Sequence, residues 1–504
     1  MEAGNFTSVN LITAYFKRID EVNLQGATLR AVIETNPTAL FEAQVLDEER
    51  SFFGPRGPLH GIPVLLKDNI GTIASEGLNT TAGSFSLLGS VVPRDAGVVT
   101  RLRKAGAVIL GKANLSEFAH FRGNLASGWS GRGGQCSGAY FPAIDPCGSS
   151  SGSGVAASIG LAAVTLGSET DGSITCPASH NNAAGIKPTV GLTSRSQVVP
   201  ISSHQDTVGP ITRSIADAAA VLSVIAGKDP LDNFTLAQPD PVPDYTKALN
   251  KSALAGARIG VPRTAFLRNV DSVQMAAFNQ SLKTMAALGA TIVDPADLPS
   301  ANEIRASDNE TEVLDVDFKI ELNRYYEGLL ENPSGVRSLA DLIAFNDANP
   351  ELEEPEGFTS QSTLIEAEAT TGMNTAYFAA LAADKDLGAT RGIDAALKQF
   401  NLDALVLPAS VSTTPAAIAG YPIVTVPLGF YPEGTPVVNG SAGPLTVYPT
   451  PSAPFGLSFF STAFSEFKLI GLAYAYEQAT LTRLNGPKPF AAAIPLTQLG
   501  DVVQ

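Results

Sequence analysis

The sequence predicts an α/β protein in which helices cover a β-sheet. Short apolar runs bounded by glycine or proline, typical of buried strands, alternate with longer segments whose apolar residues recur at helical spacing. The chain has 504 residues, of which 44% are hydrophobic and 16% charged, so it can bury a large core. This alternation is the pattern of helices packed on both faces of a sheet.

The first elements illustrate the pattern. Thr7 or Ser8 is placed to cap a helix whose apolar positions recur at helical spacing, namely Leu11, Ile12, Tyr15, Phe16 and Ile19. Residues 59–68 form a short apolar run that predicts a buried strand with Lys67 and Asp68 at its end. Asp95 is expected to cap a helix that ends near residue 105, before a strand over 108–110.

The rest of the chain continues in the same way. We expect strands over 258–261, 290–293, 403–407 and 421–426, and helices over 271–288 and 465–478. Residues 298–390 are acidic and mostly helical in pattern, which predicts a helical insertion or cap, and residues 430–454 form a Pro/Gly-rich loop. Proline and glycine are spread along the whole chain, so a single domain over 1–504 is predicted.

Charge and hydropathy exclude two classes of partner. The net charge of −16 and the pI near 4.8 argue against nucleic acid and anionic membranes, which both need clustered Lys and Arg. The most apolar run, residues 154–167, is shorter than the roughly 18 to 20 residues of a membrane-spanning helix. The sequence therefore predicts no nucleic-acid partner and no membrane span.

Cysteines and glycosylation sequons bear on the compartment. Cys136, Cys147 and Cys176 match no zinc pattern and form no disulfide framework, although pairing of Cys147 with Cys176 stays open. Eight Asn-x-Ser/Thr sequons favour a secreted protein, at Asn5, Asn79, Asn114, Asn233, Asn250, Asn279, Asn309 and Asn439. Residues 1–16 carry no signal-peptide pattern, so a cytoplasmic location is the alternative.

Residues 146–191 contain two Gly/Ser loops around an apolar run of small residues. Ordering glycine and serine costs conformational entropy and buries little surface, so such loops point to a site that uses hydroxyls and backbone N–H groups. A flexible linker is the alternative, but the run over 155–166 is too apolar for one.

Three known motifs match parts of the chain poorly. Gly148–Gly152 fits the G-x-S-x-G nucleophile elbow around Ser150, yet no histidine follows residue 204 to act as its base. Residues 152–157 fit a relaxed dinucleotide pattern, but Asp145 and Pro146 stand where its strand should be. Residues 465–468 and 307–309 resemble two penicillin-binding elements in reversed order and without the third.

A fourth interpretation joins Lys67, Ser149 and Ser173. Without a usable histidine, a serine nucleophile needs another base, and a lysine desolvated at the end of a buried strand has its ammonium pKa lowered. Residues 169–173 form a tight turn that is suited to aim consecutive N–H groups at one oxygen.

Four ordered segments carry a family resemblance: Gly61-Ile-Pro-Val-Leu-Leu-Lys-Asp68, Cys147-Gly-Ser-Ser-Ser-Gly152, Gly167-Ser-Glu-Thr-Asp-Gly-Ser-Ile174 and Gly185-Ile-Lys-Pro-Thr189. Together they resemble the amidase signature family over essentially the whole chain, and the branch of peptide amidases and of plant and fungal amidases in particular. The 24 positions between Ser149 and Ser173 also match that family. The first residues fall inside the family's first helix, so we expect a further N-terminal piece.

The resemblance implies a fold and a set of catalytic residues. The fold would be a large twisted sheet, mostly parallel or mixed, with a catalytic core over about 55–230 and 400–504 and the helical cap over about 298–390. Ser173 resembles the acylated nucleophile, Ser149 the bridging serine in a cis peptide, and Lys67 the general base. No metal or organic cofactor is implied.

Further site residues follow from the same resemblance. The oxyanion hole would be formed by the backbone N–H groups of Thr170, Asp171, Gly172 and Ser173. Ser150, Asn114 and Asp206 are expected to support the site by side-chain hydrogen bonds. Apart from the resemblance, aromatic residues on the segments that lead to the first loop are expected from their position to line an acyl pocket, namely Phe118, Phe121, Trp129, Tyr140 and Phe141. Many relatives have glycine at Asp171 and Ser151, so specificity does not transfer from them.

The sequence thus predicts an amide-bond hydrolase that works through an acyl-serine, as a monomer or homodimer. Its substrates would be small carboxamides, arylamides or the C-terminal amides of peptides. The alternatives are an amidotransferase subunit that needs partner chains, a carbamate or fatty-amide hydrolase, and a non-catalytic binding relative.

Overall fold

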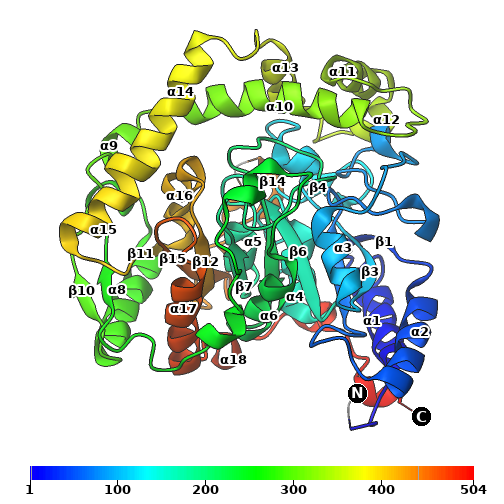
Figure 1. Cartoon of the computed structure of the whole chain (residues 1–504), viewed down its shortest axis with the longest axis horizontal. Coiled ribbons are helices and arrows are strands. Elements are labelled where there is room, and N and C mark those ends of the chain that lie inside the picture. The colour runs from blue at the N-terminus through cyan, green and yellow to red at the C-terminus, as the bar shows by residue number, and fades with distance from the viewer. Residues whose placement is uncertain (2, 441, 504) are drawn as a thin grey trace.

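An eleven-stranded sheet runs through the computed structural model, which describes residues 1, 3–440 and 442–503 (Figure 1). Strands from the N-terminal and C-terminal parts of the chain lie side by side in the middle of this sheet. In spatial order they are β1 (Val32–Thr35), β3 (Val108–Ala113), β2 (Pro63–Lys67), β6 (Val164–Glu169), β8 (Thr207–Thr212), β7 (Ala184–Lys187), β12 (Ile423–Phe430), β15 (Pro454–Phe460), β11 (Ala404–Pro408), β9 (Arg258–Gly260) and β10 (Thr291–Val293).

The sheet is mixed. Strand β2 runs parallel to β3 and β6, and β9 runs parallel to β10 and β11, whereas the other neighbouring pairs are antiparallel. The predicted α/β class with a large mixed sheet is therefore confirmed.

Alternation along β2 shows how both faces of the sheet are covered. Val64 and Leu66 pack in one cluster with α3 (Gly97–Lys104) and α6 (Ile215–Ile225). Leu65 packs in a second cluster with α1 (Ser8–Val22) and α4 (Ser151–Ile159). Because side chains alternate along a strand, Lys67 shares the face of Leu65 and points toward the start of α4.

The predicted helical insertion is present as a set of helices that crosses one end of the molecule (Figure 1). In chain order they are α9 (Ala301–Ile304), α10 (Asn309–Glu327), α11 (Leu339–Ala348), α12 (Pro350–Glu353), α13 (Ser362–Glu368) and α14 (Thr375–Lys385). A π-helical segment, Asp386–Ile393, then leads back toward the sheet.

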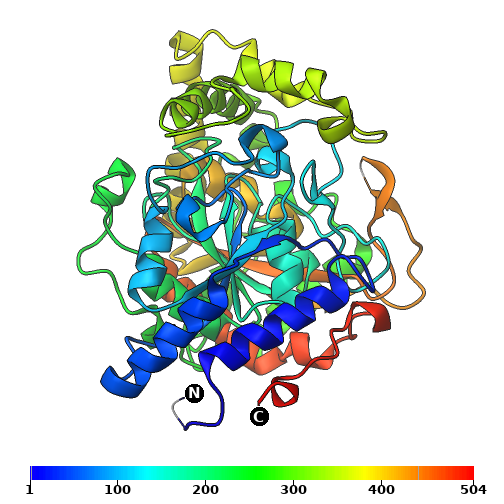
Figure 2. The same ribbon diagram turned by 90° about the vertical axis from the view of Figure 1, so that its right-hand side faces the viewer.

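The remaining elements complete the two layers. The helices are α2 (Ala39–Phe53), α5 (Thr175–His180), α7 (Arg263–Phe266), α8 (Ser272–Ala287), α15 (Asp394–Phe400), α16 (Thr413–Ala419), α17 (Glu466–Thr480) and α18 (Thr482–Asn485). Two small hairpins join β4 (Trp129–Ser130) to β5 (Gly134–Gln135) and β13 (Asn439–Gly440) to β14 (Gly443–Val447). The C-terminal segment lies beside α1, where Glu21 accepts hydrogen bonds from Leu496 and Thr497 (Figure 2).

The helix caps test the predicted boundaries. Thr7 caps α1, as predicted, and Asp271, the first residue of the predicted helix 271–288, is the cap residue of α8. Asp95 does not cap α3: the cap residue is Ala96, because the Asp95 carboxylate accepts from the Ile73 N–H and pairs with Arg103 instead.

The segment 430–454 is not wholly a loop. Outside residue 441, which lies beyond the described residues, it holds the β13–β14 hairpin and the start of β15. Among the described residues, none of the helices combines the length and the apolar character needed to cross a membrane.

Candidate active site

Lys67 ends β2 with its side chain fully buried. Its Nζ lies 2.7 Å from Ser149 Oγ, 2.9 Å from Ser168 Oγ and 3.1 Å from the Ser168 carbonyl oxygen. Burial lowers the pKa of Lys67 to about 7, although the carboxylates of Asp206 and Glu169 oppose that shift. The amine is therefore poised to exchange a proton with Ser149 near neutral pH.

Ser149 follows a cis peptide bond with Gly148, as the resemblance implied. Its carbonyl oxygen accepts from the Ser116 N–H at 3.0 Å, which fixes the loop against the segment after β3. A Cβ at Gly148 would lie 2.4 Å from Ser116 Oγ, so a larger residue would displace this hydroxyl from its hydrogen bond with the Gly128 N–H.

Ser150 connects the first loop to the second. Its N–H donates to the Ser173 carbonyl oxygen at 3.2 Å, and its hydroxyl donates to the Ser168 carbonyl oxygen at 3.0 Å. Ser173, only 8% exposed, stands just before α5. Lys67, Ser149 and Ser173 thus gather at one place, although among the described residues no hydrogen bond joins the Ser149 and Ser173 hydroxyls.

Glu169 organises the turn that carries Ser173. Its Oε1 accepts from the Gly172 N–H at 3.0 Å, and its Oε2 accepts from the N–H groups of Ile174 at 2.6 Å and Thr175 at 2.7 Å. Burial raises the pKa of this carboxyl, and the nearby Lys187 ammonium opposes the rise. A buried acid that accepts several backbone N–H groups fixes the path of the turn.

The Glu169 contacts correct one prediction. The Gly172 N–H already donates to Glu169, so it is not free to bind an oxyanion as the sequence led us to expect. The N–H groups of Thr170, Asp171 and Ser173 stay as the predicted donors, since the described residues offer them no hydrogen-bond acceptor.

Two further residues of the turn, Thr170 and Asp171, form side-chain hydrogen bonds with other segments. Thr170 Oγ1 donates to Asp206 Oδ1 at 2.6 Å, while Asp206 Oδ2 accepts from two backbone N–H groups, so Asp206 supports the turn directly. Asp171 Oδ2 accepts from Thr414 Oγ1 at 2.8 Å, and the Glu310 carboxyl of α10 lies close enough to Asp171 to interact with it electrostatically. Burial and this neighbouring carboxylate raise the pKa of Glu310 well above its ordinary value.

Asn114 is a buried residue that joins three loops. Its side-chain amide donates to the carbonyl oxygens of Arg30 and Gly134, and its Oδ1 accepts from Ser130 Oγ at 2.7 Å. Its own carbonyl oxygen accepts from the Gly152 N–H at 2.9 Å, in the first turn of α4. Asn114 therefore supports the first loop, and within the described part of the chain it makes no hydrogen bond to Lys67 or Ser173.

Three of the five predicted pocket aromatics, Phe118, Phe121 and Trp129, contact the helical insertion, whereas Tyr140 lies against Phe430 of β12 and Phe141 packs on the main core. Phe121 packs on Phe318 of α10 with ring centroids 4.4 Å apart, and Phe118 meets the same ring edge-on. Trp129, 3% exposed, stacks on Phe358 at 4.7 Å. These rings hold the insertion against the sheet, and a role in lining the substrate pocket stays a prediction.

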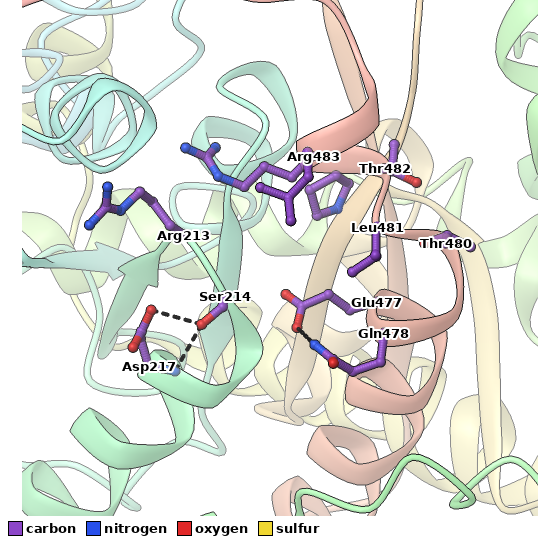
Figure 3. A pocket seen from close by; sticks show the side chains of 11 residues that line it. Arg213, Ser214, Asp217, Glu477, Gln478, Thr480, Leu481, Thr482 and Arg483 are labelled. Carbon is purple, nitrogen blue, oxygen red and sulfur yellow. Dashed lines mark hydrogen bonds between the residues drawn. The ribbon is translucent and has the colours of Figure 1, made fainter.

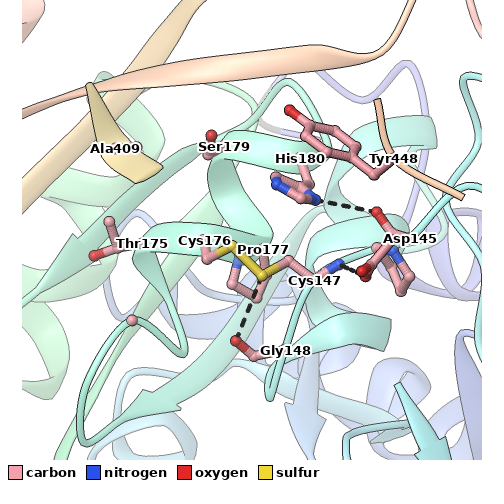
Figure 4. The surroundings of a disulfide bond; sticks show 12 residues. Asp145, Cys147, Gly148, Thr175, Cys176, Pro177, Ser179, His180, Ala409 and Tyr448 are labelled. Carbon is pink, nitrogen blue, oxygen red and sulfur yellow. Dashed lines mark hydrogen bonds between the residues drawn. A yellow bond between two sulfur atoms is a disulfide. The ribbon is translucent and has the colours of Figure 1, made fainter. Parts of the chain in front are cut away.

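A disulfide between Cys147 and Cys176 settles the pairing that the sequence left open (Figure 4). The sulfurs lie with the ring of His180 in a group whose potential ligand atoms are within 4.8 Å of one another. Both sulfurs are in the covalent bond, and His180 Nδ1 contacts the Asp145 carbonyl oxygen at 3.1 Å. The bond thus takes up the thiolates that a metal ion would need.

A cavity of about 380 Å³ lies elsewhere, between the start of α6 and the α17–α18 corner (Figure 3). Its lining includes Arg213 and Arg483. Arg213 follows the end of β8, whereas Thr207 at the start of β8 pairs with Glu169. The cavity therefore lies at the opposite end of strand β8 from the turn that carries Ser173.

Sequence reasoning missed three residues of the site. Ser168 contacts Lys67 directly, Asn69 donates to Ser168 Oγ at 3.0 Å, and Glu169 holds the turn. Ser168 and Glu169 stand inside the family segment 167–174, which is the signal that could have found them. Asn69 follows the Lys67–Asp68 pair and carried no such signal.

The family model described as Amidase matches residues 10–469, and the chain belongs to this family, that of the amidase signature enzymes. It is accordingly an amide hydrolase. Native peptide amidase from Stenotrophomonas maltophilia is 44% identical with a TM-score of 0.85, over 98% of this chain and 96% of that one.

Two further relatives extend the comparison. An amidase family protein from Bacillus anthracis has a TM-score of 0.85 at 30% identity, over 97% of this chain and 90% of that one. A glutamyl-tRNA(Gln) amidotransferase subunit from Geobacter metallireducens is 32% identical over 95% of both chains.

Proposed function

We propose that the chain hydrolyses carboxamides through an acyl intermediate on Ser173, with Ser149 and Lys67 as its proton relay. The observation that carries this proposal is the buried contact between Lys67 Nζ and Ser149 Oγ, at 2.7 Å and beside the turn of Ser173. A lysine with a pKa of about 7 has a large neutral fraction at physiological pH, as a general base requires.

The mechanism follows from these groups. Neutral Lys67 takes the proton of Ser149, and Ser149 takes the proton of Ser173 as the Ser173 oxygen attacks the amide carbonyl carbon. This step requires the two serine hydroxyls to approach to about 2.7 Å, the usual hydrogen-bond distance. The N–H groups of Thr170, Asp171 and Ser173 stabilise the oxyanion.

Collapse of the tetrahedral intermediate completes the first half of the reaction. The proton returns from Lys67 through Ser149 to the leaving nitrogen, the C–N bond breaks, and the amine or ammonia departs. Water then attacks the acyl-serine with the same relay as its base, which releases the acid and restores Ser173.

For the substrate we propose the C-terminal amide of a peptide, with small carboxamides and arylamides as further substrates. Support comes from the 44% identity to peptide amidase over nearly the whole of both chains. A hydrolysis screen across peptide amides, anilides, fatty amides and carbamates tests this choice. A preference for fatty amides or carbamates would overturn it.

Labelling tests the catalytic roles. A serine-reactive phosphonate should modify Ser173, detected by peptide mass spectrometry, and Ser173→Ala should abolish both labelling and hydrolysis. Full activity of Ser173→Ala, or labelling of another serine, would contradict the assignment.

An amidotransferase subunit is the second candidate, favoured by the 32% identity to the Geobacter metallireducens protein. Such a subunit needs partner chains, whereas a hydrolase releases ammonia alone. Purified chain that behaves as a monomer or homodimer in size-exclusion chromatography and releases ammonia from a peptide amide would exclude this candidate.

A further inference from the structure

The disulfide between Cys147 and Cys176 joins the two loops of the active site. Cys147 immediately precedes the cis Gly148–Ser149 peptide, and Cys176 lies in the first turn of α5, just after Ser173 (Figure 4). The two Cα atoms are 5.8 Å apart. One covalent bond therefore links the loop that carries Ser149 to the turn that carries Ser173.

Each cysteine is also tied to the backbone near its serine. The Cys147 carbonyl oxygen accepts from Ser151 Oγ at 2.6 Å, at the start of α4. The Cys176 N–H donates to the Gly172 carbonyl oxygen at 2.7 Å, inside the turn. A shift of either cysteine would therefore move the loop on its own side of the site.

Among the described residues, a single backbone hydrogen bond accompanies this link between the Ser149–Ser150 stretch and the Ser173 turn. It runs from the Ser150 N–H to the Ser173 carbonyl oxygen at 3.2 Å, and it leaves the hydroxyls of Ser149 and Ser173 without a mutual hydrogen bond among the described residues. The relay depends on how closely these hydroxyls can approach, and a displacement of about 1 Å at a reacting group can cost roughly 100-fold in rate.

We propose that the Cys147–Cys176 disulfide is a positioning element for the acylation step, which holds Ser149 within reach of Ser173. The inference rests on the proposed function of these two serines. Reducing the bond leaves the fold in place, because the loops keep their contacts to α4, α5 and β6. It lets the distance between the Ser149 and Ser173 hydroxyls vary more widely.

Both cysteines are partly exposed, so the bond is accessible to a reductant. A water-soluble phosphine supplies two electrons to the S–S bond, which breaks to give two thiols with protons from water. The phosphine takes the oxygen of that water and becomes its oxide. Dibromomethane can then rejoin the two sulfurs, since each thiolate displaces one bromide and a methylene bridge forms.

The experiment compares four forms of the full chain: native, reduced, reduced and bridged by dibromomethane, and the double variant Cys147→Ala/Cys176→Ala. We expect reduction and the double variant to lower kcat and the rate of phosphonate labelling by roughly 10- to 100-fold, with KM changed less than about threefold. The methylene bridge should restore most of the lost rate, whereas capping the thiols singly with iodoacetamide should not.

Cys136→Ala is the matched control, because Cys136 is a buried free cysteine outside the site. This variant should respond to reduction as the native chain does. Circular dichroism at the assay temperature measures the folded fraction of each form. A rate loss no larger than the loss of folded protein, or reduced enzyme with undiminished kcat, would overturn the inference.

Failure of the proposed function looks different. If the native, oxidised chain is not labelled at Ser173, the assignment of the catalytic serines fails. If Ser173 is labelled at the same rate in all four forms, the catalytic assignment stands and only the role of the disulfide fails.

Discussion

Three lysines are fully buried among the described residues, and their contacts differ. Lys112 Nζ donates to the Ile70 carbonyl oxygen and to Thr80 Oγ1, and Lys187 Nζ donates to the carbonyl oxygens of Pro188 and Tyr421. Only Lys67 among them contacts a serine of the Gly/Ser loops. Burial lowers the pKa of all three lysines, but of the three only Lys67 lies within hydrogen-bond distance of Ser149.

The titration of Lys67 should control the pH dependence of catalysis. Burial lowers its pKa from 10.5 to about 7, so the amine is protonated and inactive below that pH and neutral above it. We therefore expect kcat/KM for a peptide amide to rise with pH through a midpoint near 7. An ascending limb centred near pH 10 would show that Lys67 is not the base.

Substitution of the lysine gives the matching test. Lys67→Ala should lower kcat/KM by roughly 1,000-fold or more, as expected for loss of a general base that acts in a relay. Lys112→Met removes an equally buried lysine without touching the site, so it should lower the melting temperature and leave the midpoint of the pH profile unchanged.

Substitution of Glu169 tests whether its carboxylate holds the turn that carries Ser173. Glu169→Gln keeps the size of the side chain but presents an NH2 group or a weaker acceptor to the N–H groups of Gly172, Ile174 and Thr175. We expect kcat to fall roughly 100-fold with little change in KM. The Glu169 carboxylate also raises the pKa of Lys67, so the pH midpoint should move to lower pH.

Glu466→Gln is the control for Glu169→Gln. Glu466 is equally buried and also accepts a backbone N–H, that of Thr189, but it does not touch the turn. Its substitution should lower stability and leave the pH midpoint in place. Equal pH shifts in both variants would show that the effect is not specific to the turn.

Among the elements, α4 is the one whose position sets the first loop. Its first turn approaches the chain so closely that a Cβ on Gly152 would lie 2.1 Å from the Ala31 carbonyl oxygen and 2.6 Å from the Asn114 nitrogen. Backbone atoms cannot move aside as a flexible side chain can. The first Gly/Ser loop is therefore rich in glycine partly for packing.

Gly152→Ala should accordingly destabilise the fold by about 3 kcal/mol or more, or prevent soluble expression. Thermal unfolding followed by circular dichroism measures the change. Gly434→Ala serves as control, because a Cβ there meets no atom within 4 Å. A Gly152→Ala protein with the native melting temperature would contradict the packing argument.

Prediction of the elements from the sequence succeeded where periodicity was strong. The apolar runs that contain β2 and β11 were recognisable as strands, and α8 was recognisable from its helical apolar spacing. Strands β7 and β8 were not, because Ala184–Lys187 and Thr207–Thr212 contain glycine or proline and lack alternation. They are buried on both faces, and Gly209 packs against the Ile186 carbonyl oxygen, so tertiary packing decided their structure.

For the molecule as a whole, the class of fold and the three central residues of the site followed from sequence, whereas their arrangement did not. Alternating strands and helices predict an α/β class but leave the order of strands in the sheet open. The family segments pointed to Lys67, Ser149 and Ser173, yet the bonding of Glu169 with the Gly172 N–H depends on the conformation of one turn.

Glycosylation would report on the compartment in which the protein folds. From the sequons and the paired cysteines we propose passage through a secretory pathway. When the chain is produced in a glycosylating host, the exposed residues Asn233, Asn250 and Asn279 should carry glycans, whereas the fully buried Asn114 should not. Glycopeptide mass spectrometry checks each position. Secreted protein without any glycan, or with one on Asn114, would contradict this expectation.

The strand order has a consequence for biosynthesis. Residues 423–430 form β12, which lies beside β7 in the middle of the sheet, and β15 joins β12 to β11. The ribosome completes β7 at residue 187 and reaches β12 only at residue 423, so the nascent chain carries an unpaired strand edge while the residues between them are made. A chain cut short before residue 423 would lose the centre of its sheet rather than a margin.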